Sequence, residues 1–300
     1  INKFNGVNAG DVTAIQQHVT FVNVITDPYK LVCADVNKSN SVNTLDGSLI
    51  TQALLGNPAA NAQFNTSWRF VPTSHMMVNP PWGFPEQRTY TAITTSQTNQ
   101  NFVGMKIGDV TGDANPANFG SAPSLVLRAS DQILKSGETI DLRFSADQLN
   151  DLAAFQFGLT FDPAALQFVD VQTPAGLPIT ADNFGLYKIF EGEIRAVWAQ
   201  ATGITISEAS PIFQLRFTVL QSGAKLSDVL QLNDAVLPAR AFTGQLVESG
   251  VELRYSATSG TLDPTANLLE LNVQPNPFRE ETTVSFALPE ACEAQLRVFD

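Results

Sequence analysis

The chain has 300 residues, more than one ordinary domain requires, and this length predicts two or three domains. Its formal net charge is −12 with only 17 Lys and Arg residues, which excludes a basic nucleic-acid-binding surface and polybasic attachment to anionic lipid. Apolar residues make up 44% of the chain and charged residues only 15%, a balance that fits an extracellular surface. No run of about 18 apolar residues predicts a membrane-spanning helix. Two cysteines, Cys33 and Cys292, cannot form a disulfide framework.

The N-terminal region contains an internal repeat with an offset of 35 residues, so that residues 1–20 align with residues 36–55. Each copy is a polar, oxygen-rich loop followed by apolar residues at helical spacing. Each unit is therefore predicted to be a loop that runs into a helix. The helical patterns are Val12, Ile15, Val19 and Val22 in the first copy and Leu49, Ile50, Ala53 and Leu54 in the second.

The loop of the second copy has the spacing of a calcium-binding loop. Calcium takes six to eight oxygen ligands, and a loop of this spacing can turn its alternate side chains inward. Position 12 carries Asp in place of the usual bidentate Glu, and the small number of carboxylates predicts weak binding suited to extracellular calcium. The candidate ligands at positions 1, 3, 5, 7, 9 and 12 are Asp35, Asn37, Ser39, Ser41, Asn43 and Asp46.

The loop of the first copy is incomplete. Its residues at positions 3, 5, 7, 9 and 12 are Asn2, Phe4, Gly6, Asn8 and Asp11, and its position 1 would fall just before Ile1. We therefore expect the sequence to be a piece of a longer protein that begins within the loop. Because Phe4 cannot ligate a metal, this site is either degraded or uses water there. The alternative for both loops is a pair of Asn-rich turns that cap helices, but two copies at a fixed offset favour calcium.

The repeat resembles a dockerin, a small domain with two loop–helix calcium units that binds cohesin domains. Asp35, Asn37, Asn43 and Asp46 carry the resemblance. It implies that the pair of residues before position 12 contacts the partner, which places this role on Thr44 and Leu45 in the second loop. The first copy has Ala9 and Gly10 there, so two-fold symmetric binding is not expected. The repeats also resemble those of large surface proteins from the phylum Bacteroidota.

Residues 56–107 show no clean periodicity and are rich in Pro and aromatic residues. We expect an irregular extension that covers the helix pair, with most of its aromatic side chains buried. The alternative is a sugar-stacking platform of Trp82, Phe84 and Tyr90. His18 and His75 are the only histidines, so a His-based metal or catalytic site has little support.

A third, partial calcium loop follows this extension, with Asp109, Thr111, Asp113 and Asn115 at alternating positions. Its position 12 would be Gly120 and no helical pattern follows, so it is either a partial site or a tight turn. The small, polar stretch 115–123 is the clearest domain boundary. The first domain is therefore predicted to be a dockerin-like module over residues 1–118, followed by a linker at 119–123.

From Ser124 the apolar residues alternate with polar ones, as in half-buried antiparallel strands. About eight to ten short strands predict a β-sandwich or jelly roll over residues 124–257. Glu191 and Glu193 flank Gly192 and could serve acid–base chemistry, but adjacent carboxylates at a hairpin tip are typical of a solvated turn. Trp198 is expected on a strand, on a face that the pattern leaves open.

The sandwich is similar to a cohesin. The resemblance lies in the strand patterns of "SGETIDLRFSADQLNDLAAFQFGLTFDPAALQFVDVQ", "GEIRAVWAQA" and "PIFQLRFTVL" and covers most of the domain. An unrelated sandwich family is the alternative. If the helical module and the sandwich have complementary surfaces, the short linker favours contact between neighbouring chains; otherwise the two abut as rigid spacers.

The C-terminal residues resemble a type IX secretion sorting domain. After a polar linker at 258–267, residues 268–300 contain the "PNPF" turn at 275–278, the "FALP" step and the "LRVFD" strand in the family's order. The resemblance implies passage across the outer membrane of a Bacteroidota cell by the type IX secretion machinery, then surface attachment or release. The sequence stops before the family's remaining strands.

Together these features predict three parts: a small α-helical EF-hand-like module, an all-β sandwich and the start of a small β-sandwich sorting domain. The expected function is non-catalytic protein–protein association by a calcium-stabilised surface or extracellular protein, with a protein partner or a second copy of itself. The alternatives are the accessory region of a large secreted hydrolase and a carbohydrate-binding module.

Overall fold

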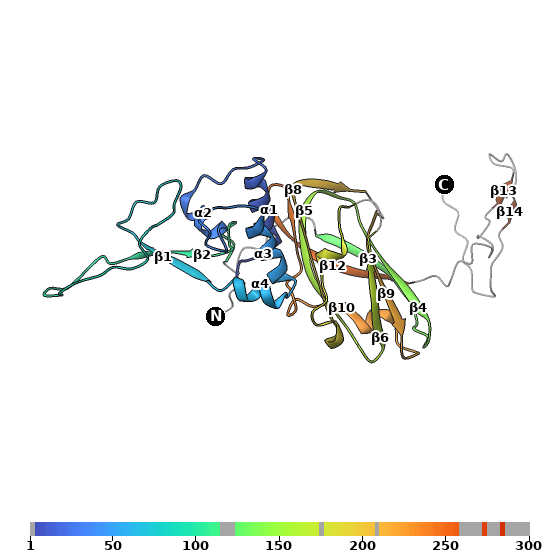
Figure 1. Ribbon diagram of the computed structural model, residues 1–300. Helices are drawn as coiled ribbons and strands as arrows, with labels where there is room; N and C mark the ends of the chain where they lie inside the picture. The colour runs from blue at the N-terminus through green and yellow to red at the C-terminus, as the bar shows by residue number, and fades with distance from the viewer. Residues whose placement is uncertain are drawn as a thin grey trace. The chain divides into compact units, whose positions relative to one another are not determined.

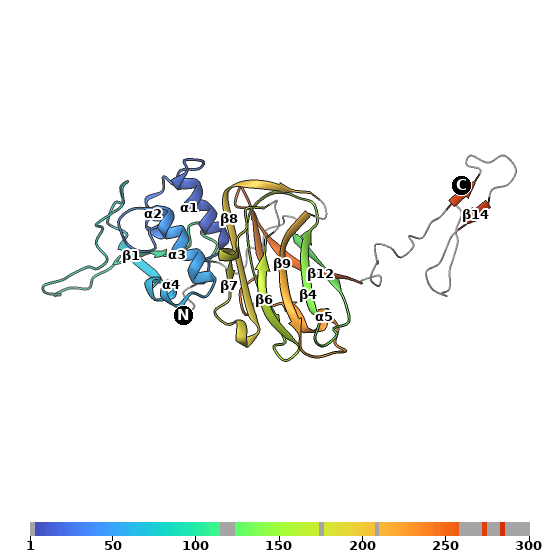
Figure 2. The same cartoon turned by 45° about the vertical axis from the view of Figure 1, so that its right-hand side comes forward.

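The computed structural model describes residues 4–114, 124–173, 177–207 and 210–257, together with the short segments 272–274 and 283–285. The chain divides into two compact units, Ile1–Ser256 and Ala257–Asp300. The first unit contains a helical module and a β-sandwich that lie against each other (Figures 1 and 2). No helix in the described part of the chain is long and apolar enough to cross a membrane.

The helical module contains α1 (Ala9–Val19), α2 (Pro28–Ala34), α3 (Thr44–Leu54) and α4 (Pro58–Gln63). Each helix begins directly after an Asn or Asp whose side chain accepts a backbone N–H of the first turn: Asn8, Asp27, Asn43 and Asn57. The helices α1 and α3 start with full capping boxes and pack against each other. These are the two helices that the repeat predicts, except that α1 ends at Val19 and the predicted Val22 lies beyond it, exposed.

The region predicted to be irregular contains a two-stranded antiparallel sheet, β1 (Trp68–Pro72) with β2 (Phe102–Lys106). Each strand is five residues long and its partner is distant in the sequence, so no local periodicity marks the pair. The hypothesis of a platform of Trp82, Phe84 and Tyr90 is wrong, because Phe84 is buried with the Arg69 guanidinium 4.4 Å from its ring centroid.

The sandwich strands follow one hydrogen-bonded order, β6–β9–β4–β3–β12–β11–β5–β8–β7, with β10 paired to β5. The strands pair antiparallel in β6–β9, β9–β4, β4–β3, β12–β11, β11–β5, β5–β8 and β8–β7. The helices α5 (Leu226–Val229), η1 (Ala181–Asn183) and η2 (Ile189–Glu191) are short. The strands are β3 (Leu125–Asp131), β4 (Thr139–Ala146), β5 (Leu149–Phe161), β6 (Leu166–Gln172), β7 (Phe184–Gly185), β8 (Glu193–Ile206), β9 (Ser210–Val219), β10 (Leu230–Leu232), β11 (Arg240–Thr243) and β12 (Glu248–Ala257).

The interior of the sandwich is built from the alternating apolar residues that the sequence marks. Phe155 and Phe157 of β5 stack on Trp198 and Phe213, with ring centroids 5.4 and 5.9 Å apart. Burial of such a side chain contributes about 1.5–3 kcal/mol. Trp198 is buried and its indole N–H donates to the Pro178 carbonyl at 3.3 Å, which settles the face that the pattern leaves open.

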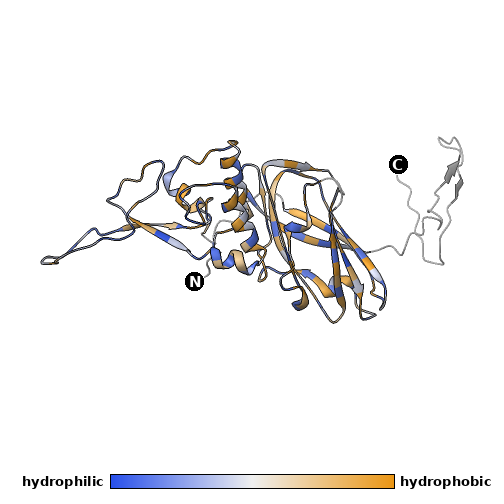
Figure 3. Ribbon diagram, viewed as in Figure 1, coloured by the Kyte–Doolittle hydropathy of each residue, from blue (hydrophilic) through white to orange (hydrophobic). Residues whose placement is uncertain are grey.

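The outer face of β5 differs from the prediction. Its residues Gln156 and Gly158 alternate with the inward-facing Phe residues and were expected on a solvated face, but both are buried. The start of α1 covers Gln156, whereas the segment that contains Val236 and Leu237 covers Gly158. Ala154 belongs to a second core, which the helices share with Val197 and Phe242 of the sandwich. Small side chains on this face let another layer approach closely, and strict alternation cannot report a strand that is covered on both sides. Figure 3 shows hydrophobic residues along both the helices and the strands of this unit.

In the second unit, β13 (Asn272–Gln274) pairs antiparallel with β14 (Thr283–Ser285). The "PNPF" turn, the linker at 258–267 and the rest of the expected sorting domain lie outside the described residues, as does the expected linker at 119–123.

We predict that Gly158→Ala destabilises the first unit by about 1–3 kcal/mol, because overpacking of a buried site forces neighbours apart. A Cβ atom at Gly158 would lie 2.7 Å from Val236 Cβ and 2.8 Å from the Leu237 nitrogen. The matched control is Gly250→Ala, whose new Cβ would meet only Ser124 Oγ, at 3.4 Å. Urea unfolding followed by tryptophan fluorescence measures the difference. Equal stability of the two variants would contradict the assigned packing.

Candidate functional site

The second repeat forms a closed loop held by two buried carboxylates. Asp35 at position 1 accepts the backbone N–H groups of Ser39 and Asn40 at 2.8 and 2.9 Å. Asp46 at position 12 accepts the N–H of Val36 at 3.0 Å with one oxygen and that of Asn43 at 3.0 Å with the other. Both carboxylates are fully buried. The start and the end of the loop are therefore tied to each other.

The backbone of this loop turns at positions that favour the left-handed conformation. Lys38 and Asn40 have φ angles of 58° and 63°. Asn40 stands at position 6, where a calcium loop normally holds Gly for its sharp turn. Asn is the residue that best replaces Gly in this conformation. Ser39 Oγ lies 3.0 Å from Ser41 Oγ, and Asn43 Nδ2 donates to Ser41 Oγ at 3.1 Å. The side chains at positions 5, 7 and 9 therefore contact one another.

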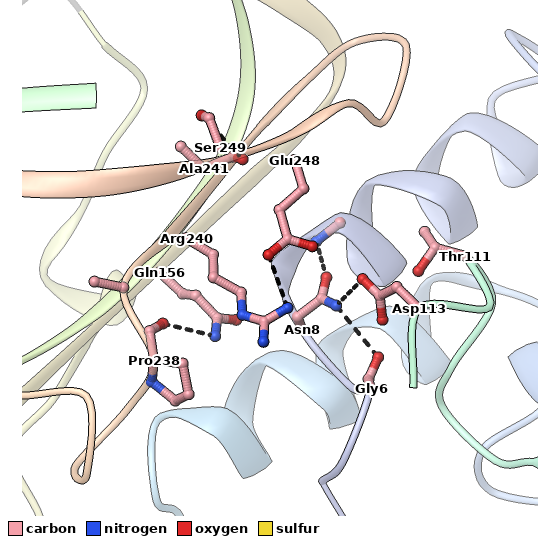
Figure 4. Close-up of polar contacts among 12 residues, drawn as sticks. Gly6, Asn8, Thr111, Asp113, Gln156, Pro238, Arg240, Ala241, Glu248 and Ser249 are labelled. Carbon is pink, nitrogen blue, oxygen red and sulfur yellow. Dashed lines mark hydrogen bonds and ion pairs between the residues drawn. The ribbon is translucent and has the colours of Figure 1, made fainter. Parts of the chain in front are cut away.

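The first and third candidate loops, which the sequence presents as two incomplete sites, lie side by side. Asp11 accepts the N–H groups of Val110 and Thr111 at 2.8 and 2.9 Å, and it also accepts the Thr111 hydroxyl at 3.0 Å. Asn8 Nδ2 donates to Asp113 Oδ2 at 2.8 Å (Figure 4). About 100 residues of chain separate these partners.

This pair of segments reproduces the hydrogen bonds of the contiguous loop. Asp109 accepts the N–H groups of Asp113 and Ala114, as Asp35 accepts those of Ser39 and Asn40. Asp11 accepts the N–H of Asn8, as Asp46 accepts that of Asn43. The contacts of Asp11 with Val110 and Thr111 match those of Asp46 with Val36 and Asn37. Residues 109–114 thus stand at positions 1–6, and residues 6–11 at positions 7–12.

Asp109, Thr111 and Asp113 keep the predicted positions 1, 3 and 5, and Gly6, Asn8 and Asp11 keep positions 7, 9 and 12, but the two sets now belong to one loop. Phe4, which the sequence places at position 5 of the first loop, packs on Phe64 with ring centroids 5.4 Å apart. Asn2, Asn115 and Gly120 lie outside the described residues. One signal in the sequence could have predicted this arrangement. Residues 109–114 have the first half of a calcium loop with no helix after it, and residues 6–11 have the second half followed by a helix, so each segment supplies the half that the other lacks.

Burial and mutual repulsion shift the pKa values of the carboxylates in these loops. Burial raises the pKa of Asp11 well above its usual value, and the neighbouring charges of Asp113 and Asp109 raise it further. Burial also raises the pKa values of Asp113 and Asp46. Over the described ranges, no three His, Cys, Asp or Glu side chains converge as a ready metal cluster. Asn, Ser and Thr side chains, backbone carbonyls or water would therefore have to supply part of any calcium shell.

The start of α1 is also bonded to the sandwich. The Ala9 N–H donates to Gln156 Oε1 at 2.9 Å, and Gln156 Nε2 donates to the Pro238 carbonyl at 3.0 Å (Figure 4). The first backbone N–H groups of a helix have no partner within the helix. Gln156, only 2% exposed, satisfies one of them from the outer face of β5.

Further contacts extend this interface along α1 and to the end of α3. Gln17 donates through Nε2 to the carbonyls of Ala201 and Gly244 at 3.0 and 2.8 Å. Arg195 donates to the Leu54 carbonyl at 3.2 Å. Gly10 lies so close to the Phe242 ring that a Cβ atom would be 2.7 Å from it. The module and the sandwich are therefore in direct contact within one chain. Contact between chains was expected only if the two surfaces were complementary, and the alternative was that the two parts abut.

Thr44 and Leu45, the predicted partner-contact pair, lie on a different surface. Both are exposed, and 59% of Leu45 is accessible. The contact with the sandwich uses α1 and the C-terminal end of α3, so the N-terminal end of α3 stays open.

The Glu191 and Glu193 carboxylates both approach Lys188, at 3.0 and 3.7 Å, at an exposed turn.

Residues 124–240 match the family model of the cohesin domain. The described strands of this segment accordingly form a cohesin-like β-sandwich.

Solved cohesin structures are also similar to the chain. The seventh type I cohesin of ScaB from Pseudobacteroides cellulosolvens has 16% identity and a TM-score of 0.36, covering 45% of this chain and 94% of that one. The second type II cohesin of the ScaA scaffoldin from Acetivibrio cellulolyticus has 16% identity and a TM-score of 0.35, covering 45% and 95%. An OlpA cohesin–dockerin complex from Clostridium thermocellum has 12% identity and a TM-score of 0.32, covering 44% and 100%. No curated protein sequence gives a significant match.

We predict that Gln156→Leu destabilises the first unit by about 1–3 kcal/mol, because it leaves the buried Ala9 N–H without its acceptor and also removes the bond to the Pro238 carbonyl. The control is Gln167→Leu on β6, where the side chain is exposed. Thermal unfolding should show a lower Tm for Gln156→Leu than for the control. A Tm equal to that of the control would contradict the assigned role of Gln156 at the interface.

Proposed function

We propose that this chain is a non-catalytic association segment of a secreted surface protein, stabilised by calcium and directed to a protein partner. The observation that carries the proposal is the combination, in one compact unit, of a cohesin-like sandwich with a helical module that bears the loop at residues 35–46. The Clostridium thermocellum structure named above is a complex of a cohesin with a dockerin, which supports protein–protein association as the kind of function.

The calcium part of the proposal rests on the loop at residues 35–46. Its carboxylates at positions 1 and 12 are buried and its alternate side chains carry oxygen atoms, which calcium prefers as ligands. Burial raises the pKa of Asp46, so its ionised form is disfavoured in the folded chain. A bound cation would offset this cost. We infer that Asp35, Asn37, Ser39, Ser41, Asn43 and Asp46 hold a calcium ion.

The partner-binding part of the proposal rests on Thr44 and Leu45. These residues begin α3 immediately before Asp46, and they are exposed. The outer face of β5 is covered by α1 of the same chain, so this sheet face is not open to a second copy. We therefore infer that the partner is a separate protein, and that it contacts the N-terminal end of α3.

We predict that calcium raises the Tm of the first unit and that Asp35→Asn makes this rise smaller. An ion that binds only the folded state stabilises it by mass action, by about 2.7 kcal/mol at a free concentration of 100 Kd. The matched controls are Asp182→Asn and Leu45→Arg, both at exposed positions, which should keep the rise. Differential scanning calorimetry in calcium and in chelator measures these shifts. Identical Tm values of the wild type in both conditions would refute calcium stabilisation.

The same samples report the association state. Light scattering in calcium should give the mass of a monomer over a wide concentration range, for the wild type and for Leu45→Arg. A mass that grows with concentration in the wild type, but not in Leu45→Arg, would instead support self-association through α3.

Secretion by the type IX machinery is proposed from the sequence of residues 268–300, of which the structure describes the pairing of β13 with β14. In a Bacteroidota host, a chain truncated after Thr265 should remain inside the cell envelope, whereas the full chain should reach the surface. The sandwich of the truncated chain should unfold at an unchanged temperature, because Ile1–Ser256 is a separate compact unit. Normal surface display of the truncated chain would disprove the sorting role.

A further inference from the structure

We propose that residues 109–114 and residues 6–11 together form one discontinuous calcium-binding loop, a second metal site in the helical module. The proposal rests on the proposed function in one respect, that this module takes calcium. It differs in its residues, which come from two segments about 100 positions apart in the sequence. Its candidate ligands at positions 1, 3, 5, 7, 9 and 12 are Asp109, Thr111, Asp113, the Gly6 carbonyl, Asn8 and Asp11.

The two segments meet between positions 6 and 7, in the middle of the 12-residue loop. Ala114 stands at position 6 and Gly6 at position 7. A Cβ atom on Gly6 would lie only 2.6 Å from the Ala114 Cα atom, so the two backbones are in contact there. Gly6 has a φ angle of 76°, a conformation that Gly adopts without strain. The chain of the discontinuous loop is therefore interrupted only between Ala114 and Gly6. Elsewhere its hydrogen bonds follow those of the loop at residues 35–46.

One carboxylate oxygen in this loop is buried without a hydrogen-bond partner. Asp113 Oδ1 has less than 1 Å² of exposed surface and no hydrogen-bond partner, while Oδ2 of the same group accepts from Asn8. A buried acceptor without a partner costs about 1–3 kcal/mol, and more when it is charged. Asp11, which is fully buried, and Asp109, which is 6% exposed, add two more carboxylates nearby. A divalent cation would satisfy the free oxygen and offset the repulsion among the three groups.

The position of this loop links it to the contact between the module and the sandwich. Asn8 caps α1 and bonds to Asp113, and the next residue, Ala9, donates to Gln156 of β5. An ion in the discontinuous loop would therefore fix the start of α1 at the place where the helix meets the sheet. It would also hold residues 109–114, the last described residues before the sandwich, against the N-terminal segment.

The alternative is that Asp11 and Asp109 only organise backbone N–H groups and no ion binds. The number of calcium ions per chain separates the two. Isothermal titration calorimetry of the full calcium-depleted chain with CaCl₂ should give two ions. The chain should be preceded by Gly-Ser-Gly. With this leader, no carboxylate upstream of Ile1 can take position 1 of the loop in place of Asp109.

Asp113→Asn is the test variant, because it keeps an oxygen for Asn8 and removes only the charge. It should weaken one of the two ions by about tenfold or more, since the number of charged ligands tunes calcium affinity. Asp109→Asn should reduce the count to one, Asp35→Asn should also leave one, and the double variant Asp35→Asn/Asp109→Asn none. The control Asp182→Asn, at an exposed position of the sandwich, should bind two.

Cys33 reports whether each variant keeps the module folded. It is buried, and burial raises the pKa of its thiol to about 12, so alkylation in the folded chain should be slow. In a Cys292→Ser background with calcium present, Asp113→Asn should stay as protected as the wild type.

The outcomes separate this proposal from the proposed function. One ion in the wild type that is lost in Asp35→Asn and retained unchanged in Asp109→Asn would overturn the discontinuous site and leave the contiguous site standing. No ion in the wild type would overturn both. Two ions with unchanged affinities in Asp113→Asn and Asp109→Asn would also overturn the assignment, because the second ion would then lie elsewhere.

Discussion

The buried start of helix α1 is the place on which the rest of the first unit depends. A helix leaves its first N–H groups without internal partners, and these groups must find acceptors when the helix end is buried. Here Asn8 accepts the Gly10 N–H, and Gln156 of β5 accepts that of Ala9. Asp11 in the same turn accepts backbone N–H groups from residues 110 and 111. One helical turn thus joins the N-terminal segment, the residues before the sandwich, and the sandwich itself.

This arrangement explains the small residues at the interface. A polar strand face can be covered by a helix only if its polar groups are satisfied and its side chains leave room. Gln156 meets the first condition through Ala9 and Pro238. Gly10 and Ala154 meet the second by letting α1 approach β5 and Phe242 closely. The sandwich therefore supports a second core on its outer face, in addition to the core between its sheets.

The same turn concentrates negative charge. Asp11 lies within electrostatic range of Asp109 and Asp113 because the two half-loops close on each other, and burial disfavours the charged form of Asp11 and Asp113. In the contiguous loop the corresponding positions 1, 5 and 12 are Asp35, Ser39 and Asp46, with one carboxylate fewer. The discontinuous loop therefore has one more negatively charged residue at these positions. Its proposed ion and the stability of the helix–sheet contact would then depend on each other.

The sequence by itself determined the elements whose signals are local. The alternation of Phe155, Phe157 and Leu159 predicted the inner face of β5, and the repeat located α1 and α3, whose caps Asn8 and Asn43 were identified from the structure. It could not show that β1 pairs with β2, because five-residue strands so far apart leave no periodic signal. Nor could it show that the outer face of β5 is buried, since polar and small residues there also suit a solvated strand. Only the tertiary structure joined residues 109–114 to residues 6–11, because a calcium-loop spacing is recognised along one continuous segment, whereas the hydrogen bonds that complete this loop cross about 100 residues of chain.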